Sequence, residues 1–238
     1  AKWGEVSTNG QVSGRRNMII NGAMNVAQRS ASVTGIGAAA GYFTLDRFKL
    51  NLASTAGRLT MTQTADGPSG FANCLKLDCT TADTSIAAGE NMILQQKFEG
   101  QDVQQLKKGT SDAEKITVSF YAKQNEERDI VLALYDSESD RYIGKVVTIG
   151  TDWTRHTVTF DGDTTGAITD DNASRFELWW WLHSGTTFTS SALTTTWAAS
   201  TSGSNLAAGT ESFFASTNNT FFITGVQMEV GSVATPFE

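Results

Sequence analysis

Alternation of apolar and polar residues with a period of two constrains this chain more than any other feature. In 116–120 and 176–182 every second side chain is apolar. Successive side chains of a β-strand point to opposite faces, so each segment presents one face to a core. Turn-forming Gly, Asn, Asp and Ser residues separate such segments. The pattern predicts an all-β fold of roughly ten to thirteen strands, a two-sheet antiparallel sandwich and most naturally a jelly roll.

Helix signals are sparse. Residues 102–106 predict one short helical turn, because the two lysines and the glycine of 107–109 suit a helix C-terminus. Residues 1–16 are polar and Gly-rich without periodicity, which predicts an extended arm or linker, with a disordered lead-in as the alternative. We expect residues 17–238 to form a single jelly-roll domain.

The charge and the cysteines exclude several classes of protein. A net charge of −7 and a pI of about 4.9 argue against a nucleic-acid partner, because an acidic surface repels phosphates. No stretch approaches the roughly 20 apolar residues of a membrane span, and the N-terminal residues do not resemble a signal peptide. Cys74 and Cys79 lie five apart on a predicted strand and hence on opposite faces, so we expect two free, buried thiols.

Several short stretches keep a characteristic order along residues 15–238. They are RRNMIINGAM (15–24), AQR (27–29), FTLDRF (43–48), FEGQD (98–102), LKKGT (106–110), VSFYAK (118–123), TGVQMEVGS (224–232) and ATPFE (234–238). As a set they resemble virion proteins of phages that infect marine bacteria, a family described as tail-fibre or carbohydrate-binding-module-like. The resemblance implies a jelly roll on a virion appendage, made in the host cytoplasm and often assembled as a homotrimer.

This resemblance leads to three functional hypotheses. The first is a structural tail-fibre or similar virion protein that contacts bacterial surface glycans without catalysis and meets other virion proteins through residues 1–16. The second is a purely structural component (head fibre, decoration or tail assembly) that binds only other virion proteins. The third, more distant, is a polysaccharide depolymerase. Fold alone does not decide between them.

An aromatic stripe in 175–183 (RFELWWWLH) predicts where a glycan would bind. Its even-numbered residues are all apolar and belong to a core, whereas the odd-numbered ones mix indoles with charged groups. Sugar rings stack their C–H faces on aromatic rings while their hydroxyls take polar partners. The predicted glycan-binding residues are Glu177, Trp179, Trp181 and His183 of the stripe, Tyr121 and Tyr135 of two other strands, and Trp197 of the 184–212 loop.

The alternative for this stripe is protein packing. Trp, Tyr and Arg are also enriched in subunit interfaces, and the 184–212 loop could cover the stripe within one chain. Trp197 has the same two interpretations, as an exposed stacking platform or as an anchor that fastens its loop.

Catalytic and metal signals are weak. The only histidines are His156 and His183, and the chain has no Gly-x-Ser-x-Gly elbow, zinc spacing or phosphate-binding loop. We therefore predict no enzyme, no catalytic residue and no cofactor, and interpret His156 as a hydrogen-bonded, half-buried side chain. One group of aspartates has three interpretations, in order of preference: residues that hydrogen-bond their own backbone in turns, ligands of a structural calcium ion, and a pair of carboxylates for glycoside hydrolysis. Its members are Asp161, Asp163, Asp170 and Asp171.

Overall fold

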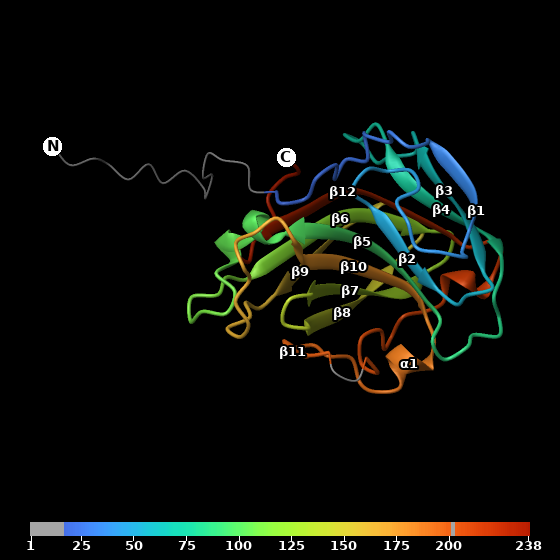
Figure 1. Cartoon of the computed structure of the whole chain (residues 1–238). Helices are drawn as coiled ribbons and strands as arrows, with labels where there is room; N and C mark the ends of the chain where they lie inside the picture. The colour runs from blue at the N-terminus through green and yellow to red at the C-terminus, as the bar shows by residue number, and fades with distance from the viewer. Residues whose placement is uncertain (1–16, 201–202) are drawn as a thin grey trace.

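Two antiparallel sheets of six strands each pack face to face (Figure 1). This computed structural model describes residues 17–200 and 203–238, so the predicted arm 1–16 lies outside the described residues. The predicted all-β, two-sheet jelly-roll sandwich is confirmed.

The first sheet contains both the first and the last strand of the described chain. In spatial order its strands are β1 (Ser32–Ile36), β3 (Arg58–Thr64), β4 (Cys74–Thr81), β12 (Thr220–Val230), β6 (Ile116–Gln124) and β9 (Thr154–Phe160).

The second sheet carries the aromatic stripe on one of its inner strands. In spatial order its strands are β11 (Ala198–Ala199), β8 (Arg141–Ile149), β7 (Arg128–Asp136), β10 (Ser174–Ser184), β5 (Asn91–Glu99) and β2 (Lys49–Ala53).

The core lies between the two sheets and follows the predicted period. Phe176, Leu178, Trp180 and Leu182 of β10 point inward and are buried, with Trp180 near the middle of the strand. The Trp180 ring lies 5.8 Å from Phe120 of the first sheet and 6.4 Å from Phe48. Burying aromatic side chains of this size supplies much of the stability of such a core.

Both cysteines lie on β4 and are buried and free, as predicted. Burial is the main reason that the pKa of the Cys74 thiol rises to about 12. A thiol with so high a pKa stays protonated and is a poor nucleophile.

In residues 17–200 and 203–238, four short helical segments interrupt the strands. The predicted turn at 102–106 is present as two 3-10 turns, η1 (Gly100–Asp102) and η2 (Gln104–Leu106), and Lys107 then takes a left-handed φ of 49°. The other two, α1 (Thr186–Thr189) and η3 (Phe213–Ala215), were not predicted because they lie in and beside a Ser/Thr-rich segment without helical periodicity. In the described part of the chain, no helix is long and apolar enough to cross a membrane.

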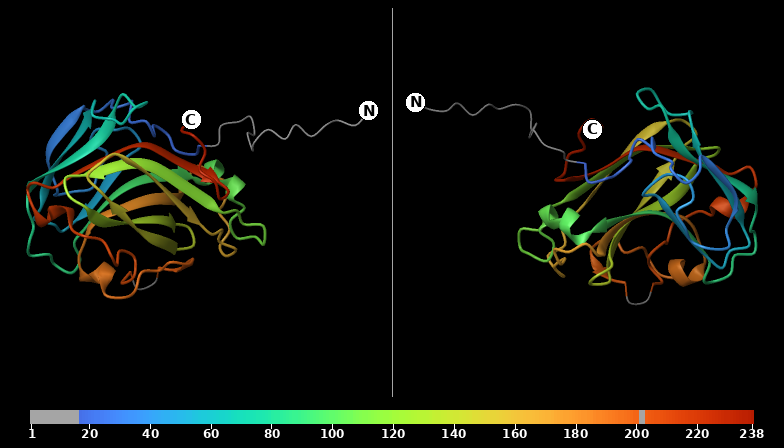
Figure 2. Two further views of the ribbon diagram at one scale, coloured as in Figure 1. Left: turned by 180° about the vertical axis from the view of Figure 1, so that it is seen from behind. Right: turned by 45° about the horizontal axis from the view of Figure 1, so that its top comes forward.

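Residues 185–200 and 203–211, which we name the roof segment, lie in the chain between β10 and η3. Figures 1 and 2 show this segment along the side of the second sheet that faces away from the first sheet. It is fastened by the pairing of β11 with β8 and by a hydrogen bond of 2.8 Å from the Gly144 amide to the Thr194 carbonyl. The Tyr142 hydroxyl also donates to the Leu206 carbonyl. The roof segment therefore covers part of the outer face of the sheet.

Candidate functional site

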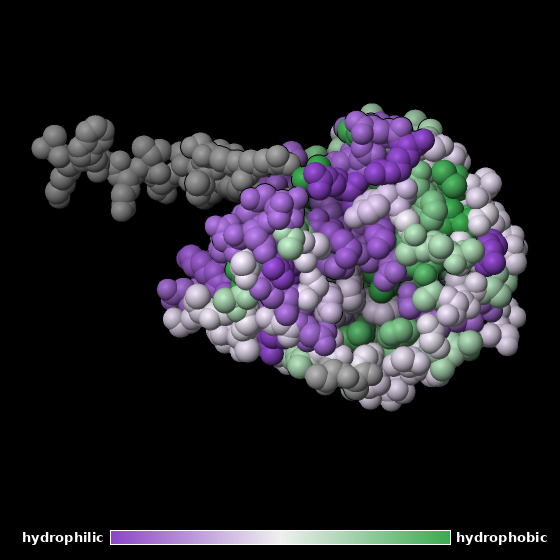
Figure 3. Space-filling view, viewed as in Figure 1, coloured by the Kyte–Doolittle hydropathy of each residue, from purple (hydrophilic) through white to green (hydrophobic). Residues whose placement is uncertain are grey.

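The roof segment divides the outer face of the second sheet into a covered half and an open half. The covered half holds Trp181 with the neighbouring apolar residues of β7 and β8. The open half carries polar residues of β10, β5 and β2, of which Lys49, Asn51 and Lys97 are partly exposed whereas Gln95 and Glu177 are buried. Trp179 and Tyr135 lie at the boundary. Figure 3 shows a hollow in the middle of this face, with hydrophilic surface above it.

Trp181 belongs to a second apolar cluster and not to an accessible site. Only 1% of its surface is exposed, and its ring lies 5.2 Å from Phe188 of the roof segment. Leu206 and Ala207 of the same segment are buried in this cluster. The prediction that Trp181 contacts a glycan is therefore corrected, and coverage by the 184–212 loop is what the structure shows.

Trp179 and Tyr135 form a stacked pair across the β10–β7 pairing. Their ring centroids are 4.5 Å apart with 28° between the planes. Trp179 is 9% exposed, whereas Tyr135 is only half-buried. The Tyr135 hydroxyl donates to Asp140 at 2.9 Å. Burial, and next this carboxylate, raise the pKa of Tyr135 to about 12, so the phenol stays neutral.

Glu177 lies beside this pair and is held by three donors. It accepts hydrogen bonds from the Trp179 indole at 2.7 Å, from Gln95 at 3.2 Å and from Lys97 at 2.6 Å. The side chain of Glu177 is almost fully buried, while one third of the Lys97 side chain is exposed. Charge-assisted bonds of this kind are strong and fix the orientation of the groups that share them.

Gln95 and Lys97 were not predicted, although the signal for them is simple. Both lie on β5 at alternating positions, opposite Trp179 and Glu177 of β10. Period two along 91–99 puts them on one face. That this face adjoins the aromatic stripe depends on non-local strand pairing, which periodicity does not reveal.

His183 leaves the predicted face because the β10–β5 register shifts between Trp181 and His183. Its Nδ1 lies 2.8 Å from the Ser212 hydroxyl and its Nε2 lies 3.2 Å from Glu90. Burial lowers the pKa of His183, and the nearby Glu90 only partly opposes this. The Ser212 oxygen also accepts the Phe214 amide and so caps η3.

This Ser–His–Glu chain joins the two ends of the roof segment. His183 precedes the segment, Ser212 follows it, and Glu90 additionally accepts the Ala87 amide at 2.9 Å. His183 has no exposed surface, so we assign the chain a fastening role. It lies outside the open half, and the prediction that His183 contacts a glycan is corrected.

Tyr121 and Trp197 are also elsewhere. Tyr121 lies on β6 of the first sheet, where its ring is 5.3 Å from Phe71. Trp197 packs with its ring 6.2 Å from Phe176 and donates to the Asp161 carbonyl at 2.7 Å. Neither ring reaches the open half. Of the two interpretations of Trp197, the structure shows the anchor that fastens its loop.

The four predicted carboxylates do not converge on a common point. Asp161 is paired with Lys115 at 2.8 Å, and Asp171 is paired with Arg175 at 2.6 Å. Asp170 is exposed. Within residues 17–200 and 203–238 no group of three or more His, Cys, Asp or Glu residues could hold a metal ion. The placement therefore does not support the predicted calcium site or a hydrolytic pair.

Asp163 has a structural partner set. It accepts two hydrogen bonds from Arg141, at 2.6 and 2.9 Å, and lies 3.1 Å from Lys108, whose Nζ is also 2.5 Å from Asp136. Burial opposes ionisation, but the hydrogen bonds from Arg141 and Lys108 outweigh it and lower the pKa of Asp163. This buried network ties loops to the ends of β7 and β8.

The comparisons with known proteins concern the general arrangement only. No protein-family model matches the chain, and no curated protein matches it. Among solved structures, a CBM4 structure shares 13% identity, with 89% of this chain and 99% of that chain covered and a TM-score of 0.44. The family 11 carbohydrate-binding module from Clostridium thermocellum, in complex with a β-1,3-1,4-mixed-linked tetrasaccharide, shares 8% identity over 80% and 92% of the two chains (TM-score 0.41).

A third similar structure comes from a phage. The enzymatically active domain of tailspike protein 4 of bacteriophage CBA120 shares 12% identity, covering 90% of this chain but 21% of that chain, with a TM-score of 0.43. All three TM-scores are below 0.5, so these similarities carry no argument about function. We therefore argue function from the side chains of the open half.

Proposed function

We propose that this chain binds glycans without catalysis through the open half of its second sheet. The observation that carries the proposal is the Tyr135–Trp179 pair beside the three-donor network on Glu177. A half-exposed ring, held in place from behind and bordered by fixed polar groups, is the combination that a sugar ring needs.

Each part of the site has a separate task. Tyr135 offers a ring for the C–H face of a pyranose. Lys97 offers ammonium protons and Asp140, which is exposed, offers carboxylate oxygens to sugar hydroxyls. Glu177 holds Trp179 and Lys97 in place, which lowers the entropy cost of binding.

The proposed setting is a tail fibre or similar appendage of a phage virion, and it rests on the resemblance of residues 15–238 to such proteins. In that setting a homotrimer would multiply weak single-site binding by avidity, and residues 1–16 would meet other virion proteins.

A glycan array combined with whole-cell binding of candidate host bacteria tests the proposal. We expect wild-type protein to bind a restricted set of glycans, and Tyr135→Ala and Lys97→Met to reduce that binding by at least about tenfold, as loss of a stacking or charged contact does. Lys115→Met is the matched control, because Lys115 is exposed and paired with Asp161 away from this face.

The other outcomes point to the remaining hypotheses. Absence of binding to any glycan or cell, together with capture of other virion proteins, would favour the purely structural component. Release of reducing sugar from a bound polysaccharide would favour a depolymerase.

A further inference from the structure

A short backbone pairing extends the second sheet beyond β2. Gly41 and Leu50 exchange two backbone hydrogen bonds of 2.9 and 3.0 Å. Leu50 is fully buried in the core. Because neighbours along an extended chain point to opposite faces, Tyr42 and Lys49 both lie on the outer face, next to the open half.

A pocket of about 250 Å³ opens at this edge. It is lined by Arg29, Tyr42, Asp46 and Arg47. The Arg29 guanidinium lies 5.4 Å from the centre of the Tyr42 ring, and its Nη1 lies 3.5 Å from Asp46. This ion pair is long and the Arg29 side chain is 53% exposed, so the guanidinium keeps donors available for a ligand.

Arg47 is placed in the pocket by an unusual backbone conformation. Its φ is 73°, a left-handed value that a bulky residue adopts only at a cost in backbone strain. Arg47 is exposed, and within the described residues the side chains of Arg47 and Lys49 have no hydrogen bond or ion pair. Two cations with unused donors therefore lie at one edge of the sheet.

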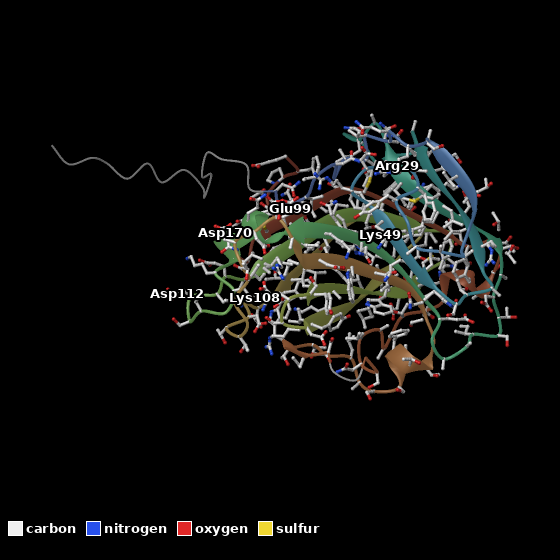
Figure 4. All side chains as sticks on the ribbon, viewed as in Figure 1. Arg29, Lys49, Glu99, Lys108, Asp112 and Asp170 are labelled. Atoms are coloured by element: carbon white, nitrogen blue, oxygen red, sulfur yellow. The ribbon has the colours of Figure 1, made fainter. Side chains whose placement is uncertain are left out.

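The local charge is opposite to that of the whole protein. The chain carries −7. Around the pocket, the cations Arg29 and Arg47 and the neighbouring Lys49 outnumber the single lining carboxylate, that of Asp46. Figure 4 shows Arg29 and Lys49 on the same face of the molecule. A positive patch on an acidic protein attracts anions selectively.

We propose, on the basis of the proposed function, that the glycan is anionic and that this pocket binds the carboxylate or sulfate of one of its sugar residues. The guanidinium groups of Arg29 and Arg47 present planar forks of donors that suit either anion. Lys49 lies between the pocket and Lys97 along the sheet face, so a chain that leaves the pocket passes to the Tyr135 ring.

The test measures binding of the full chain to three soluble polymers: polygalacturonate, which carries carboxylates alone, dextran sulfate, which carries sulfates alone, and neutral dextran. The test variant is R29Q/R47Q and the control is K107Q/K115Q, which changes the net charge equally. Lys107 and Lys115 are more than half exposed, belong to the segment between β5 and β6, and do not line the pocket. Figure 4 shows Asp112 of that segment far from Lys49. R47G is a second variant, because glycine suits a φ of 73° and removes the side chain without backbone strain.

We expect the wild type to prefer an acidic polymer over dextran by at least about tenfold, R29Q/R47Q and R47G to lose most of this preference, and K107Q/K115Q to keep it. The polymer that binds more tightly identifies carboxylate or sulfate. Equal binding of dextran and acidic polymers by the wild type, or equal losses in test and control variants, would overturn the inference while leaving glycan binding intact. Failure to bind any glycan on the array would overturn both proposals.

Discussion

The indole of Trp179 stacks on the phenol of Tyr135 at 4.5 Å, across the boundary between the covered and open halves of one sheet face. One ring of the pair is 9% exposed and the other is half-buried. Neighbouring aromatic residues of the same face therefore have different tasks. Those under the roof segment stabilise the fold, and Tyr135 meets solvent.

Trp181→Ala is expected to destabilise the protein by about 3–5 kcal/mol, because it leaves a cavity under the roof segment. Urea unfolding followed by circular dichroism measures this loss, and Tyr135→Ala should cost clearly less because that ring is only half-buried. Full stability of Trp181→Ala combined with lost glycan binding would show that Trp181 is accessible after all.

Stability is expected to fall as the pH drops below about 6.5, the ordinary pKa of histidine. Burial lowers the pKa of both His183 and His156 in the folded chain. The unfolded chain therefore takes up protons that the folded chain does not, so acid favours unfolding. Melting temperatures between pH 5 and pH 8 check the direction.

His156 allows a sharper version of this test. Its ring stacks on Phe120 at 5.4 Å, and its Nε2 is buried without a hydrogen-bond partner among the described residues. The predicted half-burial is confirmed, whereas the predicted hydrogen bonding is wrong for this atom. His156→Phe keeps the stacking and should flatten the pH dependence, and an unchanged profile would remove His156 from the explanation.

Lys108→Met is expected to cost about 3–5 kcal/mol, the usual effect of removing one partner of a buried charge network. It leaves Asp136 and Asp163 facing each other with Arg141 as their remaining cation. Lys115→Met, at an exposed pair, should change stability by less than about 0.5 kcal/mol. Equal denaturation midpoints of the two variants would argue against a buried network.

Ser212 is expected to resist a fluorophosphonate probe. Its oxygen caps η3 and bonds to a histidine without exposed surface, so no substrate reaches the pair. Ser212→Ala should lower stability by about 1 kcal/mol, as loss of an N-cap does. Labelling of the wild type that disappears in Ser212→Ala would instead reveal a nucleophile.

The inward-facing half of β10 could be predicted because it depends on period two alone. Phe176, Leu178, Trp180 and Leu182 are all buried in the core. The outer face could not be predicted so well, because a Ser/Thr/Gly-rich segment has the same composition whether it is free or packed. In the roof segment only isolated residues such as Phe188 and Leu206 supply apolar contacts.

The second feature that could not be predicted is which residues, distant in sequence, become neighbours in the fold. Tyr121 and Tyr135 look equivalent in sequence, yet strand pairing places them on different sheets. The carboxylates of 161–171 likewise look like a cluster, yet Asp161 and Asp163 take their cations, Lys115 and Arg141, from distant segments of the chain. Such choices follow from non-local pairing, and period two carries no information on them.

Isothermal titration of the best array glycan into wild type, Tyr135→Ala and Trp181→Phe tests the central claim most directly. Glycan binding at the open half predicts that Tyr135→Ala loses at least about tenfold in affinity, while Trp181→Phe, folded and covered by the roof segment, binds as the wild type does. Wild-type affinity in Tyr135→Ala would contradict the account and place the glycan on another surface.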